Sequence, residues 1–121
     1  GIECPAHLEG TDWSGVLSDP GLPPKRDHVI FETEFGTFGE RLGYLGRAVR
    51  TARYKYMIFN TGEHREFLAD LENDRGETIN LAGHPDHQGE MDRHRTFLRD
   101  YIVRTKDIFP LDKVPIPGDS F

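Results

Sequence analysis

The chain has 121 residues, of which 36% are apolar and 30% are charged, and its formal net charge is −6. This length suits a single domain, and the acidic balance argues against nucleic acid as a partner, because phosphate neutralisation dominates that affinity. No apolar run approaches the roughly 20 residues of a membrane span, so we expect no membrane partner either.

Residues 1–26 predict an irregular lead, because prolines and glycines interrupt them throughout. Only the segment DWSGVL, residues 12–17, indicates a short ordered turn, in which Trp13 and Leu17 are available to dock on another surface. We therefore expect the lead to act as a linker or strap rather than as a packed element.

The segment HVIFETEF, residues 28–35, alternates in polarity and predicts a strand. One face holds Val29, Phe31, Thr33 and Phe35, and the other holds His28, Ile30, Glu32 and Glu34. We expect the first, apolar face to be buried and the carboxylate face to be solvated. The next segment, GTFGERLGYLG (36–46), contains four glycines and predicts a mobile or tightly approached loop.

Two further strands are predicted for RAVRT (47–51) and YKYMIFN (54–60), joined by a short hairpin link. Alternation divides the cations between faces, because Arg47 points to one side of its strand and Arg50 to the other. In the second of these strands one face holds Tyr54, Tyr56 and Ile58, and the other holds Lys55, Met57 and Phe59. EFLADL (66–71) predicts a fourth, short strand.

A helix is predicted from Pro85, which suits a first helical position, to Arg104 and Lys106, which suit the dipole at its end. Its apolar stripe consists of Met91, Phe97, Leu98, Tyr101 and Ile102. Residues 107–121 hold three prolines, and we expect them to lie extended. The order of elements predicts an α+β fold: a four-stranded antiparallel β-meander with one long C-terminal amphipathic helix packed on one face.

Three groups of residues have side chains suited to chemistry, but each also has an ordinary structural explanation. They are His84, Asp86, His87 and His94 for zinc, Cys4 with His7 for a nucleophile, and the pair Glu32 and Glu34 for acid–base catalysis. Histidines and aspartates commonly occupy helix starts, Cys4 sits in a proline-containing loop, and alternation alone accounts for the two glutamates. We therefore expect no catalytic residue and no metal ligand in this chain.

The arginines leave more than one function open. A guanidinium fork matches sulfate, phosphate or carboxylate, so Arg47 and Arg50 are candidates for anion binding. One alternative is a stand-alone anion- or carbohydrate-binding module. A weaker one is a single-strand nucleic-acid binder that uses Arg50, Lys55, Tyr54 and Tyr56, which the division of the cations between faces disfavours.

The run RAVRTARYKYMIFNTGEHREFLADLENDRGETINLA, residues 47–82, resembles the C-terminal subdomain of formylglycine-dependent sulfatases, which belong to the alkaline phosphatase superfamily. Those enzymes carry R-x-V-R-T-x-x-Y-K-Y-I, then E-L-Y-D-L-x-x-D-P-x-E-x-x-N-L-A and a final long helix. The matching residues are Arg47, Val49, Arg50, Thr51, Tyr54, Lys55, Tyr56, Asp70, Leu71, Asp74, Glu77, Asn80 and Leu81. GIECPAHLEG is similar to the segment G-I-x-x-P-x-x-x-x-G that leaves the catalytic domain. Arg75 replaces the usual proline, and TDW (11–13) replaces Ser-Leu, which bears on the subfamily.

The resemblance implies a phosphatase-like catalytic domain N-terminal to residue 1, and three parts in this chain. Residues 1–26 would be the irregular lead from that domain, 27–106 the sulfatase C-terminal subdomain, and 107–121 an extended tail. Calcium and the formylglycine, which is made in a Cys/Ser-x-Pro-x-Arg motif, would lie in the catalytic domain. Cys4 in ECPAH has no arginine at the motif position and is not that nucleophile.

The resemblance also implies hydrolysis of a sulfate ester or N-sulfate on a sulfated carbohydrate or aryl substrate by the whole enzyme. The helix-free sheet surface would dock on the catalytic domain, with Trp13, Phe38 and Tyr44 helping to bury the contact. Loops of this subdomain would shape the substrate cleft, with the glycine-rich segment 36–46 as its rim. The candidate cleft residues are Glu34, Arg41, Arg47, Arg50 and His64.

Overall fold

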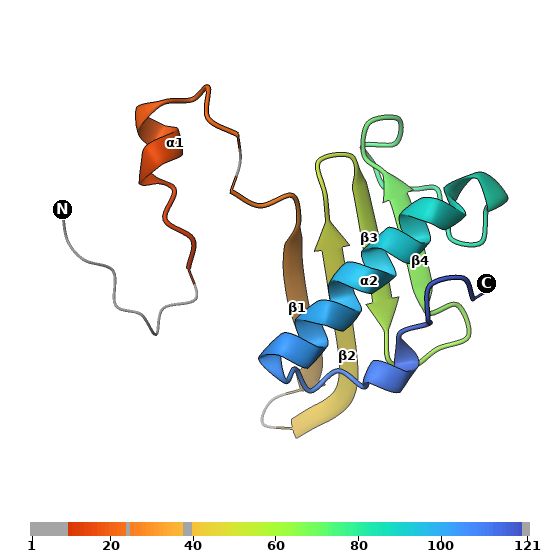
Figure 1. Cartoon of the computed structure of the whole chain (residues 1–121). Coiled ribbons are helices and arrows are strands. Elements are labelled where there is room, and N and C mark those ends of the chain that lie inside the picture. The colour runs from red at the N-terminus through yellow and green to blue at the C-terminus, as the bar shows by residue number, and fades with distance from the viewer. Residues whose placement is uncertain (1–9, 24, 38–39, 120–121) are drawn as a thin grey trace.

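The computed structural model describes residues 10–23, 25–37 and 40–119, and shows a sheet with one long helix across it (Figure 1). The elements in chain order are α1 (Ser14–Ser18), β1 (Val29–Thr37), β2 (Glu40–Arg50), β3 (Tyr54–Phe59), β4 (Glu66–Asp70), η1 (Pro85–His87), α2 (Gln88–Thr105) and η2 (Leu111–Lys113). The four strands pair antiparallel in the order β1-β2-β3-β4. The predicted α+β fold, a meander followed by a helix, is confirmed.

Alternation along the two central strands decides which side chains face α2. Arg47 and Val49 of β2 and Tyr56 of β3 are buried on the helix side of the sheet. Arg50 and Lys55 pair in register across β2 and β3, on the opposite face. The predicted separation of Arg47 from Arg50 is therefore confirmed.

The hydrophobic core lies between the sheet and α2. Its buried apolar side chains are Leu45, Val49, Tyr56, Ile58, Leu68, Met91, Leu98, Ile102, Phe109 and Val114. Burial of one such side chain contributes about 1.5–3 kcal/mol, so the amphipathic stripe of α2 is held chiefly by packing. Before α2, at the start of η1, His84 Nδ1 accepts the Asp86 N–H at 3.3 Å, and Lys106 ends α2 in a left-handed conformation with φ 56°.

The predicted burial of the apolar face of β1 is wrong. Phe31 and Phe35 are 47% and 49% exposed, whereas Ile30, on the opposite face, packs against the core. Glu32 lies on the helix side too, where its Oε1 accepts the Tyr101 hydroxyl at 2.5 Å. Alternation separates the two faces of a strand, but it does not reveal which face the helix covers.

The predicted loop at 36–46 is replaced by strand. β1 continues to Thr37 and β2 begins at Glu40, with an irregularity in their register between Phe35 and Gly36. Gly43 has a φ of +70°, which a residue with a side chain rarely adopts. Gly36, Gly43 and Gly46 therefore belong to strands of a long hairpin, and Gly39 and Phe38, a predicted interface residue, lie outside the described residues.

The two ends of the chain differ in how they meet the core. No residue of α1 is buried, and Figure 1 shows α1 standing away from the sheet beyond β1. The tail, expected to lie extended, instead includes η2 and buries Phe109 and Val114. Arg99 Nη1 on α2 donates to the Val114 carbonyl at 2.6 Å, so the tail is part of the folded unit. Within the described residues, no helix is both long and apolar enough to cross a membrane.

Candidate functional site

The sheet face opposite α2, here called the open face, displays aromatic side chains. Its cross-strand rows are Phe35–Tyr44, Thr33–Gly46–Phe59, Phe31–Ala48–Met57–Phe67 and Val29–Arg50–Lys55–Ala69. Phe31, Phe35, Tyr44 and Phe59 are each at least 37% exposed. Exposed apolar side chains gathered in this way are typical of an interaction surface.

Gly46 leaves room for the Phe59 ring on the open face. A Cβ atom at this position would lie 3.0 Å from Phe59 Cε1 and 3.7 Å from Thr33 Cβ. The Phe59 ring occupies the space above the glycine and lies 6.2 Å from the Phe35 ring, centroid to centroid. This glycine therefore shapes the surface rather than loosening the strand.

The other end of the open face is cationic. A groove of about 510 Å³ is lined there by Phe31, Thr33, Ala48, Arg50, Lys55, Met57, Leu71, Arg75 and Glu77. Lys55 Nζ lies 2.7 Å from Glu77 Oε2, so this cation is neutralised within the groove. The guanidinium groups of Arg50 and Arg75 make no hydrogen bond or ion pair with any described residue.

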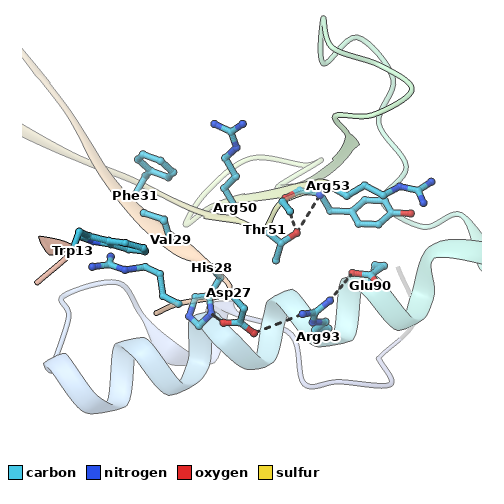
Figure 2. A pocket seen from close by; sticks show the side chains of 13 residues that line it. Trp13, Asp27, His28, Val29, Phe31, Arg50, Thr51, Arg53, Glu90 and Arg93 are labelled. Atoms are coloured by element: carbon cyan, nitrogen blue, oxygen red, sulfur yellow. Dashed lines mark hydrogen bonds and ion pairs between the residues drawn. The ribbon is translucent and has the colours of Figure 1, made fainter. Parts of the chain in front are cut away.

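Arg50 also borders a second groove, of about 1000 Å³, which runs round the start of β1 towards α2. Figure 2 shows Arg50 and Phe31 pointing away from the helix, whereas Asp27 and Arg93 lie on the helix side. Arg93 Nη2 is 3.7 Å from Asp27 Oδ2 and its Nη1 is 3.9 Å from Glu90 Oε2. The arginine on the helix side is thus paired, and Arg50 is not.

Arg47, a predicted cleft residue, has a structural environment. Its side chain and that of Asp107 are 2% and 3% exposed, and Nη2 lies 2.5 Å from Asp107 Oδ1. Nη1 donates to the Gly46 carbonyl at 2.7 Å. The Arg47 guanidinium lowers the pKa of the Asp107 carboxyl, so the pair is charged and has no free donor face for a substrate.

The remaining predicted cleft residues are not gathered at one place. Arg41 belongs to β2 near the hairpin turn, and its side chain lies outside the description. His64 is exposed in the loop between β3 and β4, at the same end of the sheet, where Asn60 Nδ2 donates to the Gly43 carbonyl. Arg50 lies at the other end of the sheet, roughly 17 Å from this end when measured along the strand. Glu34 is exposed on the helix side, opposite Leu45.

Several residues of the resemblance motif hold the sheet together. Arg53 donates to both Asp70 carboxylate oxygens, at 3.1 and 2.7 Å, which lowers the pKa of Asp70. Asn80 lies beside the outer edge of β4, where its Oδ1 accepts the Leu68 N–H and its Nδ2 donates to the Glu66 carbonyl, both at 3.1 Å. The next residue donates its backbone N–H to the Leu68 carbonyl.

Sequence reasoning missed a polar network under α2. Arg95, 1% exposed, donates Nε and Nη2 to the Glu66 carboxylate at 2.9 and 2.8 Å. Glu66 Oε1 also accepts the Tyr56 hydroxyl at 2.6 Å. The only signal was the position of Arg95 between Met91 and Leu98 on the stripe, and spacing of that kind does not reveal a buried partner 29 residues earlier.

The histidine group does not form a metal site. His94 is fully buried, with Nδ1 2.7 Å from the Glu90 carbonyl and Nε2 3.4 Å from the Thr51 hydroxyl, whereas His84 caps η1. Among the described residues, no group of three His, Cys, Asp or Glu side chains could hold a metal ion. Cys4 and His7 lie outside that part of the chain.

Comparison with known proteins identifies the relatives of this chain. No protein-family model matches it. A Δ4,5-hexuronate-2-O-sulfatase of Bacteroides thetaiotaomicron is 36% identical over 114 residues, which are 94% of this chain and 23% of the relative. The chain is homologous to the C-terminal part of sulfatases. It spans about a quarter of the length of the relatives that it matches.

Solved structures agree with this relationship. A 2-O GAG sulfatase superposes with a TM-score of 0.73 at 33% identity, covering 88% of this chain and 22% of that one. A second structure, solved in complex with its substrate D-glucosamine-2-N,6-O-disulfate, has a TM-score of 0.74 at 20% identity and covers 93% of this chain and 23% of that one. The second likeness shows the fold alone. The meander and the helix are thus features of a fold shared with a sulfatase.

Proposed function

We propose that this chain is the C-terminal subdomain of a working sulfatase and that its open face packs on the catalytic domain of that enzyme. The observation that supports this most directly is the aromatic open face, on a chain that matches one quarter of a sulfatase. Phe31, Phe35, Tyr44 and Phe59 would lose their contact with water on docking, which favours association. The helix side is already occupied by α2, so the open face is the side free to dock.

The reaction proposed for the whole enzyme is hydrolysis of a sulfate ester or N-sulfate on a sulfated carbohydrate. The names of the relatives make 2-O-sulfated hexuronates the first substrates to test, with aryl sulfates as simple substitutes. Calcium and formylglycine would belong to the catalytic domain, as the resemblance to formylglycine-dependent sulfatases implies. This chain would contribute no catalytic group.

The proposed cleft border is the end of the sheet that carries Arg41 and His64. Arg41 follows the β1–β2 turn and its side chain lies outside the described part, whereas His64 follows β3, is exposed and makes no side-chain hydrogen bond or ion pair with a described residue. We assign Arg47 a structural role, because its guanidinium is buried against Asp107. Glu34 stays a weaker candidate, because it lies on the helix side of β1.

Enzyme assays test the assignment to a sulfatase. The reading frame upstream of Gly1 is expected to encode a Cys/Ser-x-Pro-x-Arg motif, and its complete product is expected to hydrolyse 2-O-sulfated unsaturated disaccharides. The 121-residue chain alone is expected to be inactive on these substrates and on p-nitrophenyl sulfate. Turnover by the isolated chain above background would overturn the proposal, as would a complete reading frame that lacks the motif.

Thiol labelling tests the docking face separately from activity. In a Cys4→Ser background, Phe35→Cys places a thiol on the open face, and Val103→Cys places a matched thiol on the exposed side of α2. In the isolated chain both thiols are expected to react with maleimide at similar rates. In the complete protein the thiol at position 35 is expected to react at least tenfold more slowly, with that at 103 unchanged. Protection at 103 instead would contradict the proposed orientation.

A further inference from the structure

Arg50 stands out among the cations of the sheet because it has no partner in the described part of the chain. Arg47 is paired with Asp107, Arg53 with Asp70 and Lys55 with Glu77. Arg50 is exposed, lies in register with Lys55 and borders both grooves. Its strand neighbours are therefore neutralised and Arg50 is left as an uncompensated charge.

Docking of the open face would remove the charged Arg50 guanidinium from water, which is unfavourable. A guanidinium taken out of water without an anionic partner destabilises the contact by several kcal/mol, and a well-placed carboxylate offsets that cost. The groove on the open face also holds Arg75, which has no partner among the described residues either, and the one carboxylate in the described lining, Glu77, is already bound to Lys55. A surface that covers this end of the open face must therefore supply negative charge.

We propose that the catalytic-domain surface seated on the open face is divided into two zones: an apolar zone against the aromatic rings, and at least one carboxylate that pairs with the Arg50 guanidinium. This inference rests on the proposed docking of the open face. The aromatic zone would supply most of the buried area. The Arg50 ion pair would fix the register of the two domains, because a two-pronged guanidinium contact accepts few geometries.

The test uses the complete protein and the thiol at position 35 as a reporter of docking. Arg50→Glu is expected to raise its labelling rate at least tenfold, through repulsion of the facing carboxylate, and Arg50→Lys is expected to have a smaller effect. Lys113→Glu changes the charge equally at an exposed position on the tail and is expected to leave the rate unchanged. In the isolated 121-residue chain, Arg50→Glu is expected to alter neither the labelling rate nor the melting temperature.

Other outcomes separate this inference from the proposed function. If the thiol at 35 is unprotected in the complete protein before any change at Arg50, the docking proposal itself fails. If it is protected and Arg50→Glu changes neither the labelling rate nor KM, the face docks without an ion pair at Arg50, and the inference is overturned. If the thiol at 35 stays protected in Arg50→Glu while KM for a sulfated disaccharide rises tenfold or more, Arg50 contacts the sulfate of the substrate. The proposed ion pair between Arg50 and a carboxylate of the catalytic domain is then overturned as well.

Discussion

Arg47 on β2 binds the carboxylate of Asp107, sixty residues later in the chain, through two hydrogen bonds. Its Nε donates to Oδ2 at 2.6 Å and its Nη2 donates to Oδ1 at 2.5 Å. The pair joins the centre of the sheet to the segment just beyond α2. It also explains why the first arginine of the resemblance motif is buried: its role in this chain is to anchor the tail.

Removing one partner of the Arg47–Asp107 pair should lower the stability of the chain. Asp107→Asn keeps the shape of the side chain but leaves the buried Arg47 charge uncompensated, so we expect a loss of about 3–5 kcal/mol in the free energy of unfolding. Urea denaturation of the 121-residue chain at pH 7 measures this. The double variant Arg47→Met with Asp107→Leu is expected to be more stable than Asp107→Asn, because it leaves no orphaned charge. A loss below 1 kcal/mol for Asp107→Asn would show that water reaches the pair.

The same pair predicts how stability depends on acidic pH. Because Arg47 lowers the pKa of the folded Asp107 below the ordinary aspartate value of 3.8, the unfolded state binds a proton more readily than the folded state. The stabilisation is therefore complete well above pH 3.8 and is lost as the pH falls through the folded pKa. The difference in unfolding free energy between the parent chain and Asp107→Asn is expected to shrink below about pH 4. A difference that is constant from pH 7 to pH 3 would contradict this.

His94 predicts a second, separate pH effect. Burial lowers its pKa below the ordinary histidine value of 6.5, in spite of the nearby Glu90 carboxylate at 3.7 Å, which favours the charged ring. The unfolded chain then takes up a proton first, so stability is full above pH 6.5 and falls as the pH drops towards the folded pKa. Unfolding free energies measured between pH 7.5 and pH 5 are expected to decrease. In His94→Gln, which cannot titrate, this decrease should be smaller, and an equal slope would refute the assignment.

Gly46 should resist substitution because of the Phe59 ring above it. Gly46→Val forces the ring off the sheet, with an expected cost of about 1–3 kcal/mol, and Gly46→Ala should cost less because only one atom is added. Combining Gly46→Val with Phe59→Ala is expected to cost less than the sum of the two single changes. Chemical denaturation of the parent chain, Gly46→Val, Phe59→Ala and the double variant completes this cycle. Additive losses of unfolding free energy would mean that the Phe59 ring does not block the site.

Truncations at the two ends should give opposite results. Removing residues 107–121 deletes Asp107, Phe109 and Val114 and exposes the core beneath them, so we expect loss of cooperative unfolding. Removing residues 1–26 deletes α1, none of whose residues is buried, and should change the unfolding free energy by no more than about 1 kcal/mol. Circular dichroism during heating compares the two. A stable chain that lacks the tail would show that the folded unit ends near residue 106.

The order of the elements could be predicted from sequence because each has a local signal. Alternation indicated a strand at residues 54–60, which the structure has at Tyr54–Phe59, and the stripe from Met91 to Ile102 indicated the helix. What local signals could not supply was the side on which the helix lies. On β1 the more apolar face is the exposed one, because in this chain it belongs to the open face rather than to the core.

The candidate site was harder to predict, because its residues are defined by partners far away in the chain. Arg47 and Arg50 look equivalent in the segment RAVRT, and only the position of Asp107 makes the first structural. The glycines of 36–46 suggested a loop, since sequence does not show that Gly46 lies under the ring of Phe59. The exposure of Phe31 and Phe35 could not be predicted either, because it depends on which side of the sheet the helix covers.

The two edges of the sheet have different consequences for the chain when it is produced alone. Asn80 and Leu81 hydrogen-bond along β4 and so occupy that edge. Within the described residues, nothing pairs with the outer edge of β1, whose free backbone groups offer a template for a second strand. Glu32 and Glu34 place negative charge along that strand, which opposes the pairing of two copies. The negative charge on β1 therefore disfavours aggregation through this edge. Neutralising both glutamates should lower the solubility of the isolated chain.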